Sequence, residues 1–150
     1  MSAEDNVRLW EQHLFGEFVA KNEDVSLETM VEDASVMHVP TQSGGRGKAE
    51  LKPYYRDVFI PSLPAELEHK VTNRVVTDDC IVEEARIRLV HTKRMEWFLP
   101  GVPPTGKTIE FDLVIIVEFR DGKMAAERIY WDQATVLRQI GRLESRREGS

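Results

Sequence analysis

The N-terminal part of the chain has apolar residues at helical spacing, which predicts an amphipathic helix over residues 4–22. Its apolar face is expected to carry Val7, Trp10, Leu14, Phe15, Phe18 and Val19. Its polar face is expected to expose Arg8, Glu11, His13, Glu17 and Lys21. A short second helix with Ser26 as its N-cap, a strand over 34–39 and a third helix over 48–59 are predicted to follow.

Alternating apolar and polar residues dominate the second half of the chain and predict long strands. Two strands are expected over 71–77 and 81–92, with a turn at Asp78-Asp79 between them. Every second residue over 109–119 is apolar, which is the strongest signal in the chain. This pattern predicts a long strand with one buried face.

The C-terminal part of the chain is predicted to close the fold. Asp121-Gly122 is typical of a hairpin turn and should lead into a return strand over 125–131, followed by a helix capped by Asp132. The order of helices, long strands and a final helix predicts an α+β fold. We expect a cone-shaped, strongly curved antiparallel sheet wrapped around the N-terminal helices, with a closing C-terminal helix. Residues 1–150 should form one domain, with about 143–150 as a flexible basic tail.

Composition and short motifs argue against several functions. The net charge of −6 does not favour nucleic-acid binding, and no segment approaches the roughly 20 apolar residues of a membrane span. The acidic N-terminus without a long apolar run predicts a cytoplasmic protein. One cysteine, Cys80, and four histidines without metal-ligand spacing predict no metal site. No dinucleotide fingerprint is present, so no cofactor is expected.

Four short motifs together resemble one protein family. They are the turn PPTGK at 103–107, the hairpin DGK at 121–123, the acidic residue Glu127, and D-x-x-x-[VL]-L-x-Q-x-G at 132–141. The chain is similar to the SnoaL-like polyketide cyclases of the nuclear-transport-factor-two-like superfamily, which also contains ketosteroid isomerase. The resemblance implies a conical pocket for a small, largely apolar carbonyl compound, cofactor-independent acid/base chemistry of the cyclase or isomerase type, and a homodimer.

The resemblance also suggests a base. Asp132 matches the aspartate that acts as acid/base in the characterised cyclases of this family. The histidine that assists it there falls near Glu118 in this chain, so the specific aldol-cyclase chemistry does not carry over directly. Periodicity places Glu118 on the polar side of its strand, with Glu110 and Asp112.

The candidate catalytic residues are Asp132 as base, with His91 or Glu127 as its partner. Each has a structural alternative: a helix N-cap for Asp132, a hydrogen-bonded histidine for His91, and an ion pair with an arginine for Glu127. Alternation places Glu127 on the strand face of Ile129 and Trp131. The candidate substrate-binding residues are Tyr130, Trp131, Trp97 and His38.

Adjacent residues in a strand face opposite ways, so Tyr130 and Trp131 should separate, one into the cone and one outward. Two other functions stay open from the sequence. One is a non-catalytic ligand-binding or dimeric assembly module, in which the outer sheet face pairs with a second copy. The other is hydrolysis of an epoxide or lactone-type ester, which the same fold supports.

Overall fold

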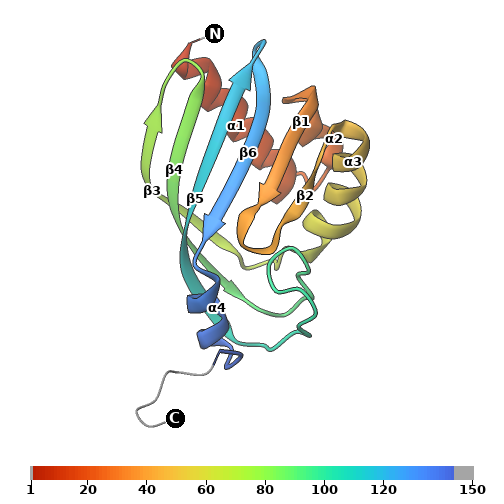
Figure 1. The fold of residues 1–150 in the computed structure, drawn as a ribbon, viewed down its shortest axis with the longest axis vertical. Helices are drawn as coiled ribbons and strands as arrows, with labels where there is room; N and C mark the ends of the chain where they lie inside the picture. Colours follow the sequence, from red (N-terminus) through yellow and green to blue (C-terminus); the bar gives the residue numbers. More distant parts are fainter. Residues whose placement is uncertain (1, 144–150) are drawn as a thin grey trace.

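The computed structural model describes residues 2–143, and its main feature is a curved six-stranded sheet (Figure 1). The strand order is β2–β1–β6–β5–β4–β3. Neighbouring strands are antiparallel except β1 and β6, which run parallel. The strands are β1 (Met30–His38), β2 (Ser43–Arg46), β3 (Glu68–Val76), β4 (Cys80–Val90), β5 (Thr108–Arg120) and β6 (Lys123–Trp131).

In the described part of the chain, four α-helices accompany the sheet. Helix α1 lies across one face of the sheet, and α4 lies at the end where the chain leaves the fold (Figure 1). The helices are α1 (Ala3–Phe18), α2 (Glu23–Leu27), α3 (Lys48–Pro53) and α4 (Gln133–Gln139), with α3 continued by a π-helical segment, Tyr54–Phe59. The predicted α+β fold is confirmed, but the sheet is mixed because of the parallel β1–β6 pair. None of the helices described here is long and apolar enough to cross a lipid bilayer.

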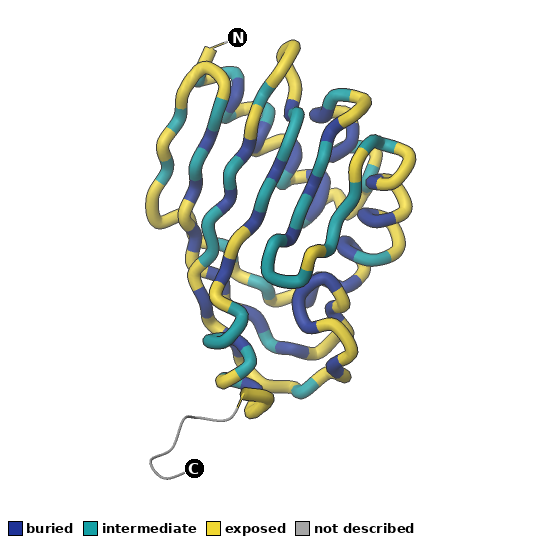
Figure 2. Tube along the Cα trace, viewed as in Figure 1, coloured by how far each residue is buried: buried dark blue, intermediate teal, exposed yellow. Residues whose placement is uncertain are grey.

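The long strands have one buried and one exposed face, as the alternation predicted (Figure 2). On β4 the buried face is formed by Ile81, Glu83, Ala85, Ile87 and Leu89. The exposed face carries cross-strand ion pairs, including Arg86 with Asp112 and Arg128 with Glu118. Glu118 therefore lies on the polar side of β5, as predicted.

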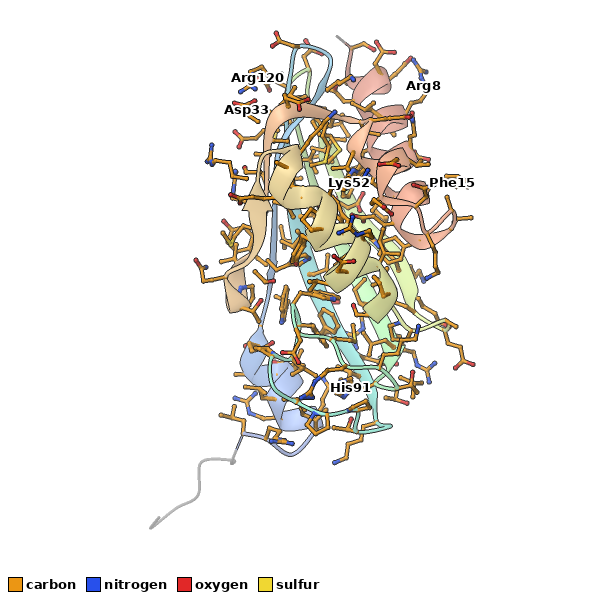
Figure 3. All side chains as sticks on the ribbon, turned by 90° about the vertical axis from the view of Figure 1, so that its right-hand side faces the viewer. Arg8, Phe15, Asp33, Lys52, His91 and Arg120 are labelled. Carbon is orange, nitrogen blue, oxygen red and sulfur yellow. The ribbon has the colours of Figure 1, made fainter. Side chains whose placement is uncertain are left out.

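Helix α1 differs from its predicted orientation. It ends at Phe18 rather than residue 22, and its buried residues are Asn6, Trp10, His13, Gly16 and Glu17. Phe15 and Val19, expected in the core, are 50% and 67% exposed, and Figure 3 shows Phe15 on the outer side of the helix. The predictions that His13 and Glu17 are exposed are wrong, because the two side chains pair with each other inside the protein.

The cap of α2 also differs from the prediction. Asn22, not Ser26, is the N-cap, and its side chain accepts a hydrogen bond from the backbone of Asp24. Ser26 is buried inside α2, and its hydroxyl donates to the carbonyl oxygen of His13. Gly16 permits this close approach, because a Cβ there would lie 2.4 Å from Ser26 Oγ.

The predicted hairpin turn and the predicted cap of the last helix are confirmed. Asp121 and Gly122 have φ angles of 54° and 76°, which is the backbone of a tight hairpin turn. Asp132 caps α4 by accepting a hydrogen bond from the backbone of Ala134. The expected basic tail falls mainly on residues 144–150, which lie outside the described residues.

Candidate active site

A narrow cavity of about 50 Å³ lies between α1 and the buried face of the sheet. Its wall is mainly apolar, with aliphatic and aromatic side chains from α1, the segment after α3 and the long strands. Four ionisable side chains interrupt this wall: Glu17, His38, His69 and Glu127. A small number of polar groups in an apolar cavity is typical of ligand sites.

Three buried ionisable groups meet beside the cavity. His13 Nε2 lies 3.1 Å from Glu17 Oε2 on the same helix and 3.3 Å from Glu127 Oε1 on β6. The opposite ring nitrogen, Nδ1, lies 3.2 Å from the carbonyl oxygen of Ser26 and 2.9 Å from the hydroxyl of Thr29. A carbonyl oxygen only accepts, so Nδ1 carries a hydrogen and Nε2 faces the two carboxylates.

The charges of this trio depend on one another. Burial alone lowers the pKa of His13, but the adjacent carboxylates of Glu17 and Glu127 outweigh it and raise the pKa to about 10. Burial raises the pKa of Glu17, although the positive charge of His13 partly offsets this effect. At neutral pH the trio therefore combines an imidazolium with two carboxyl groups, of which Glu17 releases its proton less readily than usual.

The trio has the donor atoms of a metal site, since one ligand atom from each residue lies within 4.8 Å of the others. However, the protonated imidazole already supplies the positive charge that the two carboxylates need. We therefore interpret the cluster as a proton-holding site.

His38, on β1, forms a second polar point on the cavity wall. Its Nδ1 lies 2.7 Å from the hydroxyl of Tyr54, which lies 3.2 Å from the Ser43 hydroxyl. Burial lowers the pKa of His38 to about 3, so the ring is neutral at pH 7. The Tyr54 hydroxyl can donate to Nδ1, and in that tautomer the hydrogen of the neutral ring is on Nε2. His38 also packs 4.7 Å from the ring centre of Trp97.

The predicted site residues separate into two groups. Glu127, His38 and Trp97 line the cavity. Trp131 is buried next to it and packs on Trp97, whereas Tyr130 is 39% exposed, so the predicted separation of these two neighbours is confirmed.

Asp132 and His91 lie away from this cavity. Asp132 is exposed at the start of α4, where a hydrogen bond from Thr135 is the main cause of its lowered pKa. His91 is buried at the α4 end of the molecule (Figure 3), where its Nδ1 accepts from the backbone of Thr105, and burial lowers its pKa. A role for either residue in catalysis stays a prediction.

Three residues of the cavity region were missed from the sequence: His13, Glu17 and His69. A signal for the first two was present, because His13 and Glu17 are four residues apart and therefore neighbours on one helix face. Trp10 lies on the same face, and its ring stacks on His13 with 5.7 Å between ring centres. No comparable spacing in the sequence points to His69.

Comparison with known families gives an extended match. The model of the SnoaL-like polyketide cyclase family matches residues 12–140. A comparison with curated protein sequences found no match.

Solved structures share the fold at low sequence identity. A protein described as a SnoaL-like polyketide cyclase from Jannaschia sp. CCS1 is 24% identical, with a TM-score of 0.70 over 91% of this chain and 92% of that chain. TsrD from Streptomyces laurentii is 18% identical, with a TM-score of 0.71 over 95% and 99%. IdmH from Streptomyces antibioticus is 20% identical, with a TM-score of 0.66 over 90% and 97%.

Proposed function

Because the chain belongs to the SnoaL-like polyketide cyclase family, we propose that it is a cofactor-independent enzyme acting on a small, largely apolar carbonyl compound. The ligand occupies the cavity beside α1, and the protein moves a proton on the carbon next to the carbonyl group. The observation that carries this proposal is the pair of carboxylates, Glu17 and Glu127, buried at the same nitrogen of one imidazole beside an apolar wall.

Packing alone does not account for this trio. Burying charged groups costs several kcal/mol per ion, and well-packed apolar side chains of similar volume are often at least as stable. His13, Glu17 and Glu127 are each at most 5% exposed. Ionisable groups kept at such a cost beside a cavity are candidates for proton transfer.

Glu127 is the proposed base. Among the described residues, its Oε1 has no hydrogen bond of good geometry, and its nearest charged neighbour is His13. The carboxylate takes the proton from the carbon next to the carbonyl, and the electrons of that bond move to the carbonyl oxygen as an enolate. His13 holds the carboxylate in place, and Glu17, with its raised pKa, stores or returns a proton.

His38 is the proposed partner of the enolate oxygen. A neutral imidazole is a suitable hydrogen-bond donor to developing negative charge. In the β1–β6 register, Val36 pairs with Glu127 and His38 pairs with Ile129, so His38 is one strand across and two residues along from Glu127. Strand geometry gives a distance of about 8 Å between these two backbone positions. A carbonyl compound can span this distance when its α-carbon contacts Glu127 and its oxygen contacts His38, each at about 3 Å.

The size of the cavity limits the ligand. Pockets for drug-sized molecules typically have about 300–1,000 Å³, several times the roughly 50 Å³ seen here. Leu14 and Phe18 line both the cavity and an outer groove. A ligand larger than a few heavy atoms therefore requires these two side chains to move.

The small cavity also favours a second candidate, a non-catalytic module of the same fold whose cone is filled by its own side chains. Around the cavity the interior is packed with aromatic rings, including Phe59 and Trp97, whose ring centres lie 4.9 Å apart. In this alternative the buried trio is only structural, and the protein has no effect on a carbonyl compound.

Deuterium exchange separates the two candidates without knowledge of the natural substrate. Acetone, cyclopentanone and 2-tetralone are incubated with the protein in D2O, and NMR follows loss of the hydrogens next to the carbonyl. We expect catalysed exchange of at least one ketone and a loss of about 100-fold or more in Glu127→Gln. The matched control is Glu118→Gln, since Glu118 is exposed on the opposite sheet face. Exchange unaffected by Glu127→Gln would refute the proposed base, and no exchange would favour the non-catalytic module.

A further inference from the structure

A second imidazole–carboxylate pair borders the same cavity and has no part in the mechanism proposed above. His69 on β3 and Glu83 on β4 approach each other with 3.4 Å between Nε2 and Oε2. In the strand register His69 pairs with Ile87, which is four residues from Glu83 on β4. The two side chains therefore lean toward each other along the strands to make this contact. The buried position between them on β4 is Ala85, whose methyl group leaves room for this contact.

Glu83 is fixed from its other side. Its Oε1 accepts hydrogen bonds from Trp10 Nε1 at 3.2 Å and from Arg74 Nε at 2.8 Å. Oε2 has no such bond in the described part of the chain, and its charged neighbour is His69. Burial alone raises the pKa of Glu83, but contacts with His69, Arg74 and Trp10 leave it below its ordinary value. Glu83 is thus a fixed, buried carboxylate that presents one oxygen to His69.

His69 itself is accessible. Its side chain is 16% exposed, and it lines both the inner cavity and the outer groove. The ring packs edge-on against Phe18 with 6.0 Å between ring centres. Nε2 approaches Glu83 as an ion pair without the geometry of a hydrogen bond. The other nitrogen, Nδ1, has no hydrogen bond to any described residue and remains available to a ligand or to water. A carboxylate that orients an imidazole in this way is the usual support of a proton-transferring histidine.

We propose that His69, oriented by Glu83, is a second proton-transfer residue of this cavity. The ligand is then an unsaturated carbonyl compound whose C=C bond is conjugated with the carbonyl group or can shift into conjugation, so that two of its carbons exchange protons. This inference rests on the proposed function, because it assumes that Glu127 removes the first proton. Glu83 does not touch the ligand and is a positioning residue.

The two proton-transfer groups lie on different parts of the sheet. Glu127 is on β6 and His69 is on β3, three strands away. They are also displaced along the strands, because the β3 residue in register with Glu127 is Val76, seven residues from His69. The curvature of the sheet and the length of the side chains bring both groups to one cavity wall. Two groups so placed serve different atoms of one ligand.

On a β,γ-unsaturated ketone the two groups would catalyse a shift of the double bond by one position. Glu127 takes a proton from the α-carbon, which breaks that C–H bond and gives a dienolate. The imidazolium of His69 then gives a proton to the γ-carbon, a new C–H bond forms, and the double bond shifts into conjugation with the carbonyl. Glu127 loses its proton to water, and His69 takes one from water through the groove.

Cyclohex-3-enone tests the proposal, because two rates are measured on one probe. Deuterium uptake at C2 reports Glu127, and the absorbance of cyclohex-2-enone reports proton delivery to C4. We expect His69→Gln to lower conversion about 100-fold while deuterium uptake at C2 changes less than about threefold. Lys70→Gln, at an exposed neighbouring position, is the control. His69→Asn replaces His69→Gln if the latter does not fold.

The positioning role of Glu83 has its own readout. Charged groups near His69 are Glu83 from β4, Arg74 from β3 and Glu17 from α1. Glu83→Gln removes the carboxylate that faces Nε2 of His69, so conversion should fall while deuterium uptake at C2 is retained, and Glu83→Asp should partly restore conversion. Unchanged conversion in Glu83→Gln would contradict this role.

The remaining outcomes distinguish the two proposals. Conversion unaffected by His69→Gln, or equal losses of conversion and C2 exchange, would overturn the role of His69 and leave Glu127 as the base. Wild-type exchange without conversion would also overturn it. Absence of C2 exchange in the wild type would refute the proposed function, and the inference with it.

Discussion

At the scale of single residues, one imidazole controls the charge of the cavity wall. His13 is fully buried between Glu17 and Glu127, and its pKa of about 10 lies above the ordinary value of 6.5. The folded protein therefore holds a proton on His13 that the unfolded chain loses at lower pH. This stabilisation is complete below pH 6.5 and is lost as the pH rises toward 10.

The pH dependence of stability tests this charge state. Between pH 7 and 9.5 the free energy of unfolding should fall, with a slope from His13 of at most about 1.4 kcal/mol per pH unit. Glu127→Gln removes one of the two carboxylates and should flatten the slope. Urea unfolding of both proteins at the two pH values measures it. Equal slopes would mean that Glu127 does not hold the proton on His13.

Asp132 offers a contrasting prediction, because a structural role and a catalytic role give different results. Its carboxylate accepts hydrogen bonds from the backbone of Ala134 and the hydroxyl of Thr135. Loss of this N-cap in Asp132→Ala should lower the melting temperature by about 2–4 °C, measured by calorimetry. Asp132→Asn, which can still cap the helix, should melt close to the wild type. A drop of the same size in both variants would argue against capping.

The burial of a residue could be predicted where it follows from alternation along a strand. It could not be predicted where it depends on partners that are distant in the sequence. Glu127 was placed with Ile129 and Trp131 by alternation alone, and all three are buried. His13 was expected on the surface because helical periodicity places it on the polar face of the first helix. Its burial requires Glu127, which is more than a hundred residues away in the chain.

At the scale of elements, the packing of α1 on α2 sets the position of His13. The hydroxyl of Ser26 donates to the carbonyl of His13, and the carbonyl of Ser26 lies next to His13 Nδ1. Gly16 lies at this contact, and an added Cβ would be 2.7 Å from the backbone nitrogen of Ser26.

Gly16→Ala therefore has two opposing effects. Alanine is better than glycine inside a helix by about 1 kcal/mol, so propensity alone predicts stabilisation. The contact with the backbone of Ser26 predicts that α2 moves away and that stability falls by about 1–3 kcal/mol. Urea unfolding measures the sign. Glu11→Ala, on the exposed side of α1, is the control, and a Gly16→Ala variant more stable than the wild type would contradict the packing.

The elements themselves differed in how well they could be predicted. The strand β5 was clear, because one face is buried and the other carries charged residues over most of its length. The buried face of α1 was not clear, since apolar periodicity cannot detect a helix whose buried face includes Asn6, His13 and Glu17. The parallel pairing of β1 with β6 was also missed, because no turn connects these strands in sequence.

At the scale of the whole molecule, the fold and family followed from the order of elements and a few turn motifs. The site did not, because it is assembled from side chains of α1, β1, β3, β4 and β6. Only the three-dimensional arrangement shows that Glu127 faces His13 and the cavity, while Asp132, five residues later, is exposed on α4.

The central claim is that proton transfer depends on the buried trio around His13. The most direct test compares the rates of ketone deuterium exchange in Glu127→Gln and Asp132→Asn with that of the wild type in the same buffer. We expect a loss of about 100-fold or more for Glu127→Gln and a change of less than about twofold for Asp132→Asn. Full exchange in Glu127→Gln together with a large loss in Asp132→Asn would contradict it and place the base at the start of α4.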